Sequence, residues 1–141
     1  MPSKEIKILV LGCGNAEFSE DIYDDGYHNV VNVDISPVVI DQMTERNSEL
    51  RPKMTWHVMN VTDMREFEDN TFDLAFDKST IDAILCGDDS FVNVAMMMKE
   101  TQRVLKVGGH YFAVSYGQPD ARSYHFQHPF LHFLNREFIL Y

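Results

Sequence analysis

The stretch Ile6-Lys7-Ile8-Leu9-Val10-Leu11-Gly12-Cys13-Gly14-Asn15 decides the fold. Five of its first six residues are apolar, which is typical of a short strand buried on both faces of a parallel sheet. Gly12 and Gly14 follow at once. They allow a tight turn and let a ligand approach a backbone that has no Cβ in the way. The run Ala16–Tyr23 then predicts a helix, with Asn15 as its N-cap.

A strand, a glycine turn and a helix N-terminus open a nucleotide-binding βαβ unit. The next apolar run, Val30–Val33, ends at Asp34, which lies about 20 residues after Gly14. In such a unit a carboxylate at this place accepts hydrogen bonds from two ribose hydroxyls. The alternative is that Asp34 only caps the helix that follows it. Its position favours the ribose role, and the sequence therefore predicts a site for an adenosine cofactor.

Length and charge limit the classes of function. The chain has 141 residues, of which 45% are hydrophobic and 24% charged, enough for one domain with a core. A formal net charge of −10 argues against nucleic acid or an anionic membrane as the main partner, because both attract a basic surface. The acidity favours a basic partner, such as a lysine-rich protein surface, or serves only to keep the domain soluble. Charge alone does not decide between these two readings.

Several absences indicate a soluble protein of the reducing cytoplasm. Two cysteines, Cys13 and Cys86, make no disulfide framework. Nothing at the N-terminus resembles a signal peptide, and no apolar run has the length of a membrane span.

Strand and helix patterns alternate along the remaining chain. Further strands are expected at Thr55–Met59, Phe72–Phe76 and His110–Ser115, and further helices at Pro37–Glu49, Ser79–Cys86 and Ser90–Lys106. Ser36 and Pro37 are a favoured pair of N-cap and first helical residue. The alternation predicts an α/β fold of the Rossmann-like, doubly wound kind, in which helices cover both faces of a mainly parallel sheet. We expect residues 1–141 to form a single domain.

The helical spacing also predicts which side chains face the core. In the helix at Pro37–Glu49, the sheet-facing residues are expected to be Val38, Val39 and Met43. The long helix is expected to start at the N-cap Ser90 and to stop at Gly108-Gly109. Its core-facing residues at helical spacing are Phe91, Val94, Met97, Met98, Thr101, Val104 and Leu105.

The residue at position 17 indicates which of two adenosine cofactors the site binds. A dinucleotide site has a third glycine in its G-x-G-x-x-G turn, and this chain has Glu17 there. A carboxylate in the first helical turn repels a pyrophosphate, which disfavours NAD. S-adenosylmethionine carries no phosphate and tolerates the glutamate, so it is the expected cofactor.

Three runs of the sequence resemble the class I, or seven-β-strand, methyltransferases. They are Leu9-Val10-Leu11-Gly12-Cys13-Gly14-Asn15, Val33-Asp34-Ile35-Ser36 and Phe76-Asp77-Lys78-Ser79-Thr80-Ile81-Asp82-Ala83. The third run is similar to the D-K-G-T-[LI]-D-A run of the methyltransferase-like branch that includes lysine methyltransferases of translation elongation factor 1A. The resemblance extends over essentially the whole chain.

The resemblance implies a role for individual residues. Asp34 would bind the ribose hydroxyls, Ile35 would lie against the adenine, and Asn60 and Val61 would hold the edge and face of the adenine. Lys78, with the backbone around Asp77, would border the methionine end and the entrance for the methyl acceptor. The full implied cofactor set is Gly12, Cys13, Gly14, Asn15, Asp34, Ile35, Asn60, Val61, Asp77 and Lys78.

Two positions depart from the family pattern. The family usually has an aspartate where Asn60 stands; an amide oxygen still accepts from the adenine amino group, with weaker binding as the expected effect. Asparagine is also common at strand ends for structural reasons. Ser79 replaces the usual glycine of the third run and would narrow the acceptor entrance.

The leading functional hypothesis is methyl transfer to a nitrogen, most simply a lysine of a protein that resembles an elongation factor. Such a displacement needs a neutral amine held in line with the methyl–sulfonium bond, so positioning supplies most of the rate acceleration. Asp77, Lys78 and Ser79 are the candidate catalytic residues, although Lys78 can equally be a solvated lysine. Two rivals stay open: a small-molecule methyltransferase, and an inactive cofactor-binding partner module.

Two other groups of residues invite a functional reading that the pattern does not support. Cys13 is near a helix N-terminus, but no base stands near it, so a small residue in a tight turn is favoured over a nucleophile. His125, His128 and His132 have only partly helical spacing, which Pro129 interrupts. No cysteine or carboxylate completes a tetrahedral set, and we assign no metal site.

The end of the chain differs from the family fold. The run Glu137–Tyr141 is expected to be the sixth strand, and the chain stops before a seventh. The fifth strand would then have an open edge, which is a route to strand exchange. We expect a domain truncated at its C-terminal end, and a homodimer that pairs through this edge is one hypothesis.

Overall fold

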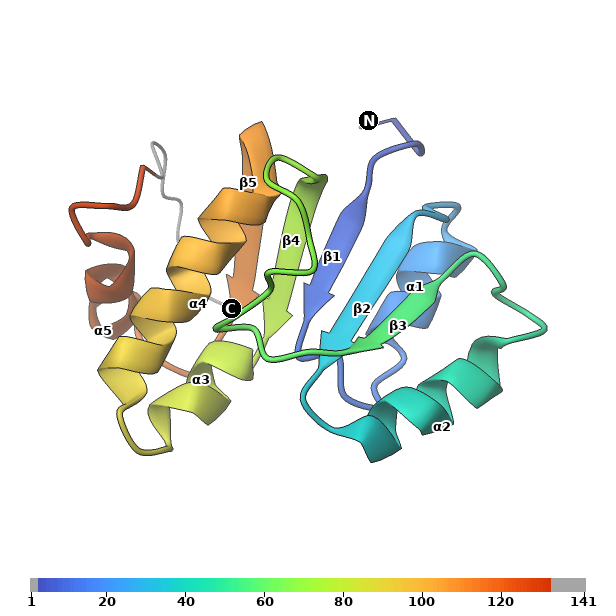
Figure 1. The fold of residues 1–141 in the computed structure, drawn as a ribbon, viewed down its shortest axis with the longest axis horizontal. Coiled ribbons are helices and arrows are strands. Elements are labelled where there is room, and N and C mark those ends of the chain that lie inside the picture. Colours follow the sequence, from blue (N-terminus) through green and yellow to red (C-terminus); the bar gives the residue numbers. More distant parts are fainter. Residues whose placement is uncertain (1–2, 133–141) are drawn as a thin grey trace.

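A parallel five-stranded sheet forms the centre of the protein (Figure 1). The computed structural model describes residues 3–132. The strands are β1 (Ile8–Leu11), β2 (Val30–Asp34), β3 (Thr55–Val58), β4 (Phe72–Lys78) and β5 (Leu105–Val114), in the order β3-β2-β1-β4-β5. The helices are α1 (Phe18–Asp24), α2 (Pro37–Asn47), α3 (Thr80–Leu85), α4 (Ser90–Val104), α5 (Pro119–Ser123) and the 3-10 turn η1 (Tyr124–Phe126). The expected doubly wound α/β fold is confirmed.

The central strand β1 explains why the sheet is buried on both faces. All four of its residues are buried, and successive side chains point to opposite faces. Leu9 and Leu11 belong to the core under α3 and α4, whereas Ile8 and Val10 belong to the core beside α1. A strand that carries apolar side chains on both faces can lie only in the middle of such a sheet.

The helices confirm the predicted pattern in part. Ser36 caps α2 as expected, because its Oγ accepts a hydrogen bond from the Val39 N–H at 3.3 Å. In the same helix Met43 is buried, but Val38 is 64% exposed and Ile40 is buried instead. The expected sheet-facing side of α2 was therefore wrong by part of a turn.

The predicted N-caps of two other helices are wrong. Helix α1 begins after Glu17, so Asn15 lies in the glycine turn and caps nothing. Helix α4 begins after Asp89, whose positive φ of 50° turns the chain into the helix without a side-chain cap, and Ser90 is already helical. Phe91 is 62% exposed and does not face the core, unlike the other residues predicted for this face of α4.

The glycine pair after α4 belongs to β5 rather than to a helix stop. Helix α4 ends at Val104, and the next residue already pairs with β4. Phe72 of β4 pairs with Leu105 of β5, and Leu74 of β4 pairs with His110 of β5. Between these two pairs, β5 therefore has more residues than β4. The extra residues of β5 form a bulge in which Gly108 has a φ of 82°. A glycine is needed there because other residues rarely adopt this conformation.

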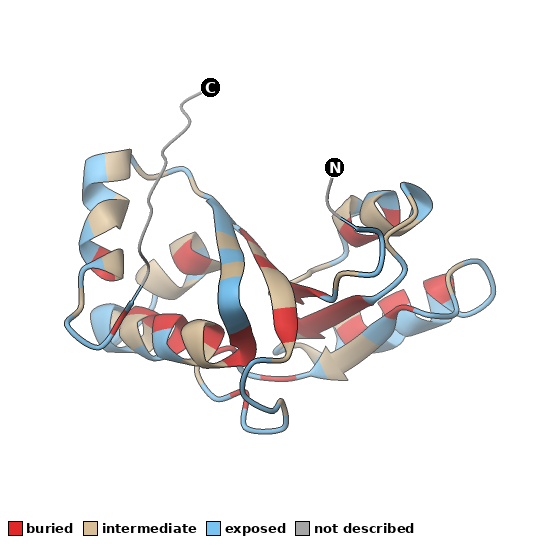
Figure 2. Ribbon diagram, turned by 90° about the horizontal axis from the view of Figure 1, so that it is seen from above, coloured by how far each residue is buried: buried red, intermediate tan, exposed pale blue. Residues whose placement is uncertain are grey.

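Strand β5 stands at the edge of the sheet among the described residues, and most of it is exposed (Figure 2). The expected open edge of the fifth strand is therefore present within residues 3–132. The run Glu137–Tyr141, expected as a sixth strand, lies outside the described residues.

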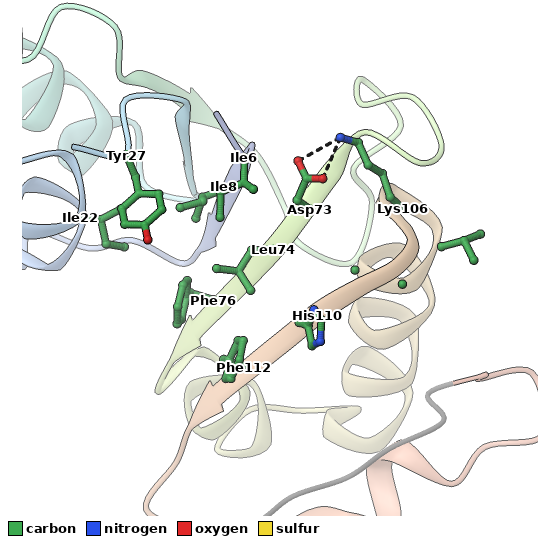
Figure 3. Close-up of a pocket in the computed structure, with 13 residues that line it drawn as sticks. Ile6, Ile8, Ile22, Tyr27, Asp73, Leu74, Phe76, Lys106, His110 and Phe112 are labelled. Atoms are coloured by element: carbon green, nitrogen blue, oxygen red, sulfur yellow. Dashed lines mark hydrogen bonds and ion pairs between the residues drawn. The ribbon is translucent and has the colours of Figure 1, made fainter. Parts of the chain in front are cut away.

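An apolar hollow of about 580 Å³ lies on the sheet face beside α1, over β4 and β5 (Figure 3). Leu74, Phe76 and Phe112 form its floor, and Ile22 and Tyr27 stand at the side of α1. The ion pair between Lys106 and Asp73, at 2.9 Å, marks its rim at the amino end of β4. The hollow is thus the part of the sheet that α1 does not cover.

Candidate functional site

A cleft of about 490 Å³ opens at the carboxyl ends of β1, β2 and β4, between their loops and α3. Ligands of open α/β sheets bind at this edge. Seven of the residues predicted for the site line the cleft: Gly12, Asp34, Ile35, Asn60, Val61, Lys78 and Ser79. Cys13, Gly14, Asn15 and Asp77 are not lining residues.

Sequence reasoning missed the wall that α3 and its following loop contribute, together with Met59 and Thr62 after β3 and Asn93 on α4. The missed lining residues are Met59, Thr62, Thr80, Ala83, Ile84, Gly87, Asp88 and Asn93. The sequence prediction considered only the glycine turn and the residues at the ends of strands. The signal that was available is the interruption of the helical pattern at Gly87, which places a loop next to the strand ends.

The two glycines of the first turn serve different purposes. Gly12 and Gly14 both have positive φ, at 60° and 57°. A Cβ at Gly12 would collide with the side chain of Thr80, whose Oγ1 donates a hydrogen bond to the Leu11 carbonyl at 2.8 Å. A Cβ at Gly14 would meet no atom within 4 Å. Gly12 therefore lets α3 approach β1, whereas Gly14, which does not line the cleft, borders open space.

Asp34 ties the glycine turn to the end of β2. Its Oδ2 accepts from the Gly14 N–H at 2.9 Å, and its Oδ1 accepts from the Ser36 N–H at 2.9 Å. A carboxylate has about four acceptor positions, so two remain for a ligand. Asp34 thus holds the turn and still presents acceptor capacity to the cleft.

The side-chain oxygen of Asn60 accepts hydrogen bonds from within its own loop. Its Oδ1 accepts from the Thr62 N–H at 3.0 Å and from the Thr62 hydroxyl at 2.8 Å. Both lone pairs of that oxygen are used, so acceptance from an adenine amino group does not fit this arrangement. Ile35 and Val61 present apolar side chains to the same end of the cleft. Asn60 therefore shapes the loop, and these two residues offer the apolar contact.

Asp77 is 1% exposed and faces the start of α3 instead of the cleft. Its carboxylate accepts from the backbone N–H groups of Thr80, at 2.6 Å, and of Ile81, at 3.1 Å, and from the Tyr111 hydroxyl at 2.9 Å. Burial raises the pKa of Asp77, although these hydrogen bonds oppose the shift. This burial corrects the expectation that the Asp77 side chain is a catalytic residue, because the carboxylate does not line the cleft.

Ser79 has a left-handed backbone with a φ of 67°. Its N–H donates to the Val114 carbonyl at 2.8 Å, and its own carbonyl accepts from Ala83, so both backbone groups hold the strained residue in place. The glycine that the resemblance places at this position has a physical reason, because glycine adopts this conformation without a Cβ penalty. Lys78, the residue before it, is exposed at the cleft.

The surroundings of Cys13, His125 and His128 indicate structural roles. Burial, with the negative charge of Asp34, raises the pKa of the Cys13 thiol to about 12, which leaves it protonated and a poor nucleophile. His125 is buried and stacks on Phe91 at 5.5 Å, and His128 stacks on Phe130 at 5.2 Å. Over residues 3–132, no three potential ligand side chains group around a metal position.

Comparison with known proteins decides the family. The model of a family described as "Methyltransferase domain" matches residues 9–113. The chain belongs to this methyltransferase family. The resemblance to class I methyltransferases is thus confirmed, and the cleft lies in the matched region.

Curated relatives of this methyltransferase domain carry related names. The chain is 47% identical over 114 residues to a Homo sapiens "eEF1A lysine and N-terminal methyltransferase", covering 79% of this chain and 16% of that protein. It is 34% identical over 130 residues to the Mus musculus "EEF1A lysine methyltransferase 4", covering 86% of this chain and 50% of that protein. The chain therefore spans half or less of the length of these relatives.

Solved structures share the fold. The PH0226 protein of Pyrococcus horikoshii matches with a TM-score of 0.67 at 29% identity, over 77% of this chain and 48% of that one. A geranyl diphosphate methyltransferase solved in complex with SAM matches with a TM-score of 0.68 at 22% identity, over 84% of this chain and 47% of that one. The methyltransferase fold is therefore well supported. In the part of the chain that the structure describes, no helix is long and apolar enough to cross a membrane.

The two glycines of the turn should differ in their tolerance of a side chain. We expect Gly12→Ala to lower the free energy of unfolding by about 3 kcal/mol, because backbone strain adds to a collision with Thr80. Gly14→Ala carries only the strain and should cost about 1 kcal/mol. Urea denaturation of both variants measures the difference, and equal costs would contradict this account.

Ser79→Gly should stabilise the domain. Relief of the left-handed strain, about 1–2 kcal/mol, exceeds the added entropy of an unfolded glycine, about 0.5–1 kcal/mol. The expected gain in the free energy of unfolding is on the order of 0.5 kcal/mol. Ser79→Ala keeps the Cβ and is the matched control, for which no gain is expected. A gain in the alanine variant would point to the hydroxyl instead of the backbone.

Proposed function

We propose that this methyltransferase domain binds S-adenosylmethionine in the cleft and transfers its methyl group to a lysine nitrogen of a protein. The observation that carries the proposal is the Asp34 carboxylate, which holds the Gly14 N–H at the head of a cleft and keeps two acceptor positions. An elongation factor of the eEF1A type is the proposed acceptor, because the human and mouse relatives named as eEF1A methyltransferases are 47% and 34% identical to the chain over the aligned residues.

The residues present fit this cofactor. Asp34 would accept hydrogen bonds from the two ribose hydroxyls, and the open space at Gly14 would admit the ribose and methionine part. Ile35 is largely exposed beside Asp34 and would lie against the adenine, with Val61 on the same side. Glu17, at the start of α1, would repel a pyrophosphate, which favours a cofactor without phosphate.

The chain's own residues would act mainly by position. When bound, S-adenosylmethionine would supply an activated methyl group: a neutral amine would receive it as the methyl–sulfonium bond breaks, S-adenosylhomocysteine would leave, and the amine would release a proton to water. Lys78 lines the cleft, and its positive charge beside an incoming lysine favours the neutral form of that lysine. Asp77 would not touch the acceptor; it holds the start of α3, and with it Ser79, at the cleft. Positioning of this kind supplies much of the acceleration in group transfer.

The net charge of −10 supports a basic protein acceptor. The cytoplasm is the proposed location, because an elongation factor would be met there. The rival of a binding module without activity is supported by the occupied oxygen of Asn60. It would show itself as cofactor binding without methyl transfer to eEF1A.

Calorimetric titration with S-adenosylmethionine tests the cofactor site. Asp34→Ala removes two acceptors of charged hydrogen bonds, about 1.5–3 kcal/mol each, so its affinity should fall by at least about 100-fold. Asp41→Ala is the control, because Asp41 is exposed on α2 and does not line the cleft. An unchanged affinity of Asp34→Ala, or no binding by the wild type, would contradict the proposed site.

We also propose that β5, which is the edge strand of the sheet among residues 3–132, pairs with a second copy of the chain. Exposed Phe112 and Val114 lie on this strand, and unpaired backbone groups at a sheet edge are a template for another strand. Light scattering should show a dimer at high concentration, and Phe112→Lys should weaken it by adding charge to the edge. A monomer at every concentration would overturn the pairing.

A further inference from the structure

The turn that follows β5 lies next to the acceptor side of the cleft. Lys78, at the end of β4, pairs with Val114, at the end of β5. The Val114 carbonyl accepts the Ser79 N–H at 2.8 Å. Because Lys78 and Ser79 both line the cleft, residues 115–118 start beside its outer wall, one strand further from the Asp34 end.

A network of hydrogen bonds fixes this turn to α3. Asp82 of α3 accepts from the Ser115 hydroxyl at 2.6 Å and from the Arg122 guanidinium at 2.6 Å. Arg122, on α5, also donates to the Ser115 hydroxyl at 2.8 Å. A side chain at Gly117 would collide with the guanidinium, so the turn folds directly over it.

The network contains an ion pair between Asp82 and Arg122 that is stronger than an exposed pair. Both side chains are mostly buried. Burial alone would raise the pKa of Asp82, but the hydrogen bonds from Ser115 and Arg122 outweigh it and lower the pKa. Pairs with charge-assisted hydrogen bonds of this kind are stronger than exposed ion pairs, and they order the segments that they join.

Tyr116 is the residue that the network presents to solvent. Its N–H donates to Asp82 at 3.1 Å, whereas its side chain is 91% exposed. The backbone is therefore fixed and the aromatic ring faces outward. Tyrosine is enriched at protein interfaces, where it offers a large contact area with few rotatable bonds.

We propose that Tyr116 contacts the protein that accepts the methyl group, and that Asp82 and Arg122 are positioning residues that hold Tyr116 beside the cleft. The inference rests on the proposed function, because it requires a protein acceptor. It assigns recognition to the turn after β5, which lies outside the cofactor cleft itself.

Steady-state kinetics with eEF1A as the acceptor test the role of Tyr116. Tyr116→Ala should raise the KM for eEF1A about 10-fold, the size typical of a lost aromatic contact at an interface. The turnover number should change by less than about twofold, and calorimetry should give an unchanged affinity for S-adenosylmethionine, because the ring does not line the cleft. Val107→Ala is the control: Val107 is 99% exposed near the amino end of β5, whereas Tyr116 lies in the turn after the carboxyl end of that strand.

The positioning role has a separate test. Arg122→Gln should raise the same KM, and Arg122→Lys should restore part of the loss, because it keeps the charge beside Asp82. In the double variant Tyr116→Ala/Arg122→Gln, the KM should equal that of Tyr116→Ala alone. A purely structural role of Arg122 would give an additional loss in the double variant.

The outcomes separate the two levels of the proposal. Methyl transfer by the wild type with an unchanged KM in Tyr116→Ala overturns the inference and leaves the proposed function intact. A further loss in the double variant overturns the positioning role. A wild type that binds S-adenosylmethionine but methylates no eEF1A overturns the proposed acceptor, and the inference with it.

Discussion

The buried carboxylate of Asp77 joins three elements that would otherwise be independent. It sits at the end of β4, accepts the first N–H groups of α3 and receives the hydroxyl of Tyr111 from β5. The first N–H groups of a helix have no partner within it, and a carboxylate there also complements the helix dipole. The place of α3 follows from this interaction. The position of Thr80 follows from it as well: the Thr80 side chain packs against Gly12, and its hydroxyl donates a hydrogen bond to the Leu11 carbonyl of β1.

Asp34 and Asp77 both lie near the ends of strands, but their different surroundings give the two carboxylates different roles. Asp34 ends β2 and is partly open, so it holds a turn and retains acceptor capacity. Asp77, near the end of β4, is covered by Tyr111 and α3, so all of its capacity goes to the fold. A carboxylate after a strand is thus a ligand group only where the next layer leaves it open.

The sequence allowed much of the fold to be predicted, because apolar strands, glycine turns and helical spacing are local signals. The same holds for Asp34, whose place relative to Gly14 is set by the length of one βαβ unit. Long-range packing was not predictable. The burial of Asp77 depends on Tyr111, 34 residues away. The exposure of Phe91 and Val38 depends on which part of each helix a neighbour covers, and periodicity does not report that.

The glycine pair near residue 108 shows a different limit. Two glycines after a helix usually mark its end, yet here they form a bulge inside the pairing of β4 with β5. Local composition is the same in both cases, and only the partner strand tells them apart. The left-handed Ser79 is a similar case, because its conformation is imposed by hydrogen bonds to β5 and α3.

The central place of β1 has a consequence for how the chain folds. β1 and β2 are close in sequence and can pair early, but the other side of β1 waits for β4, and the bond from Lys7 to Asp73 joins residues 66 apart. Contacts of such separation are made only after a large loss of chain entropy, and they slow folding. Until they form, one edge of an entirely apolar strand is exposed. During synthesis on the ribosome, β1, β2 and β3 would therefore emerge before β4 as a half-sheet that needs protection from other chains.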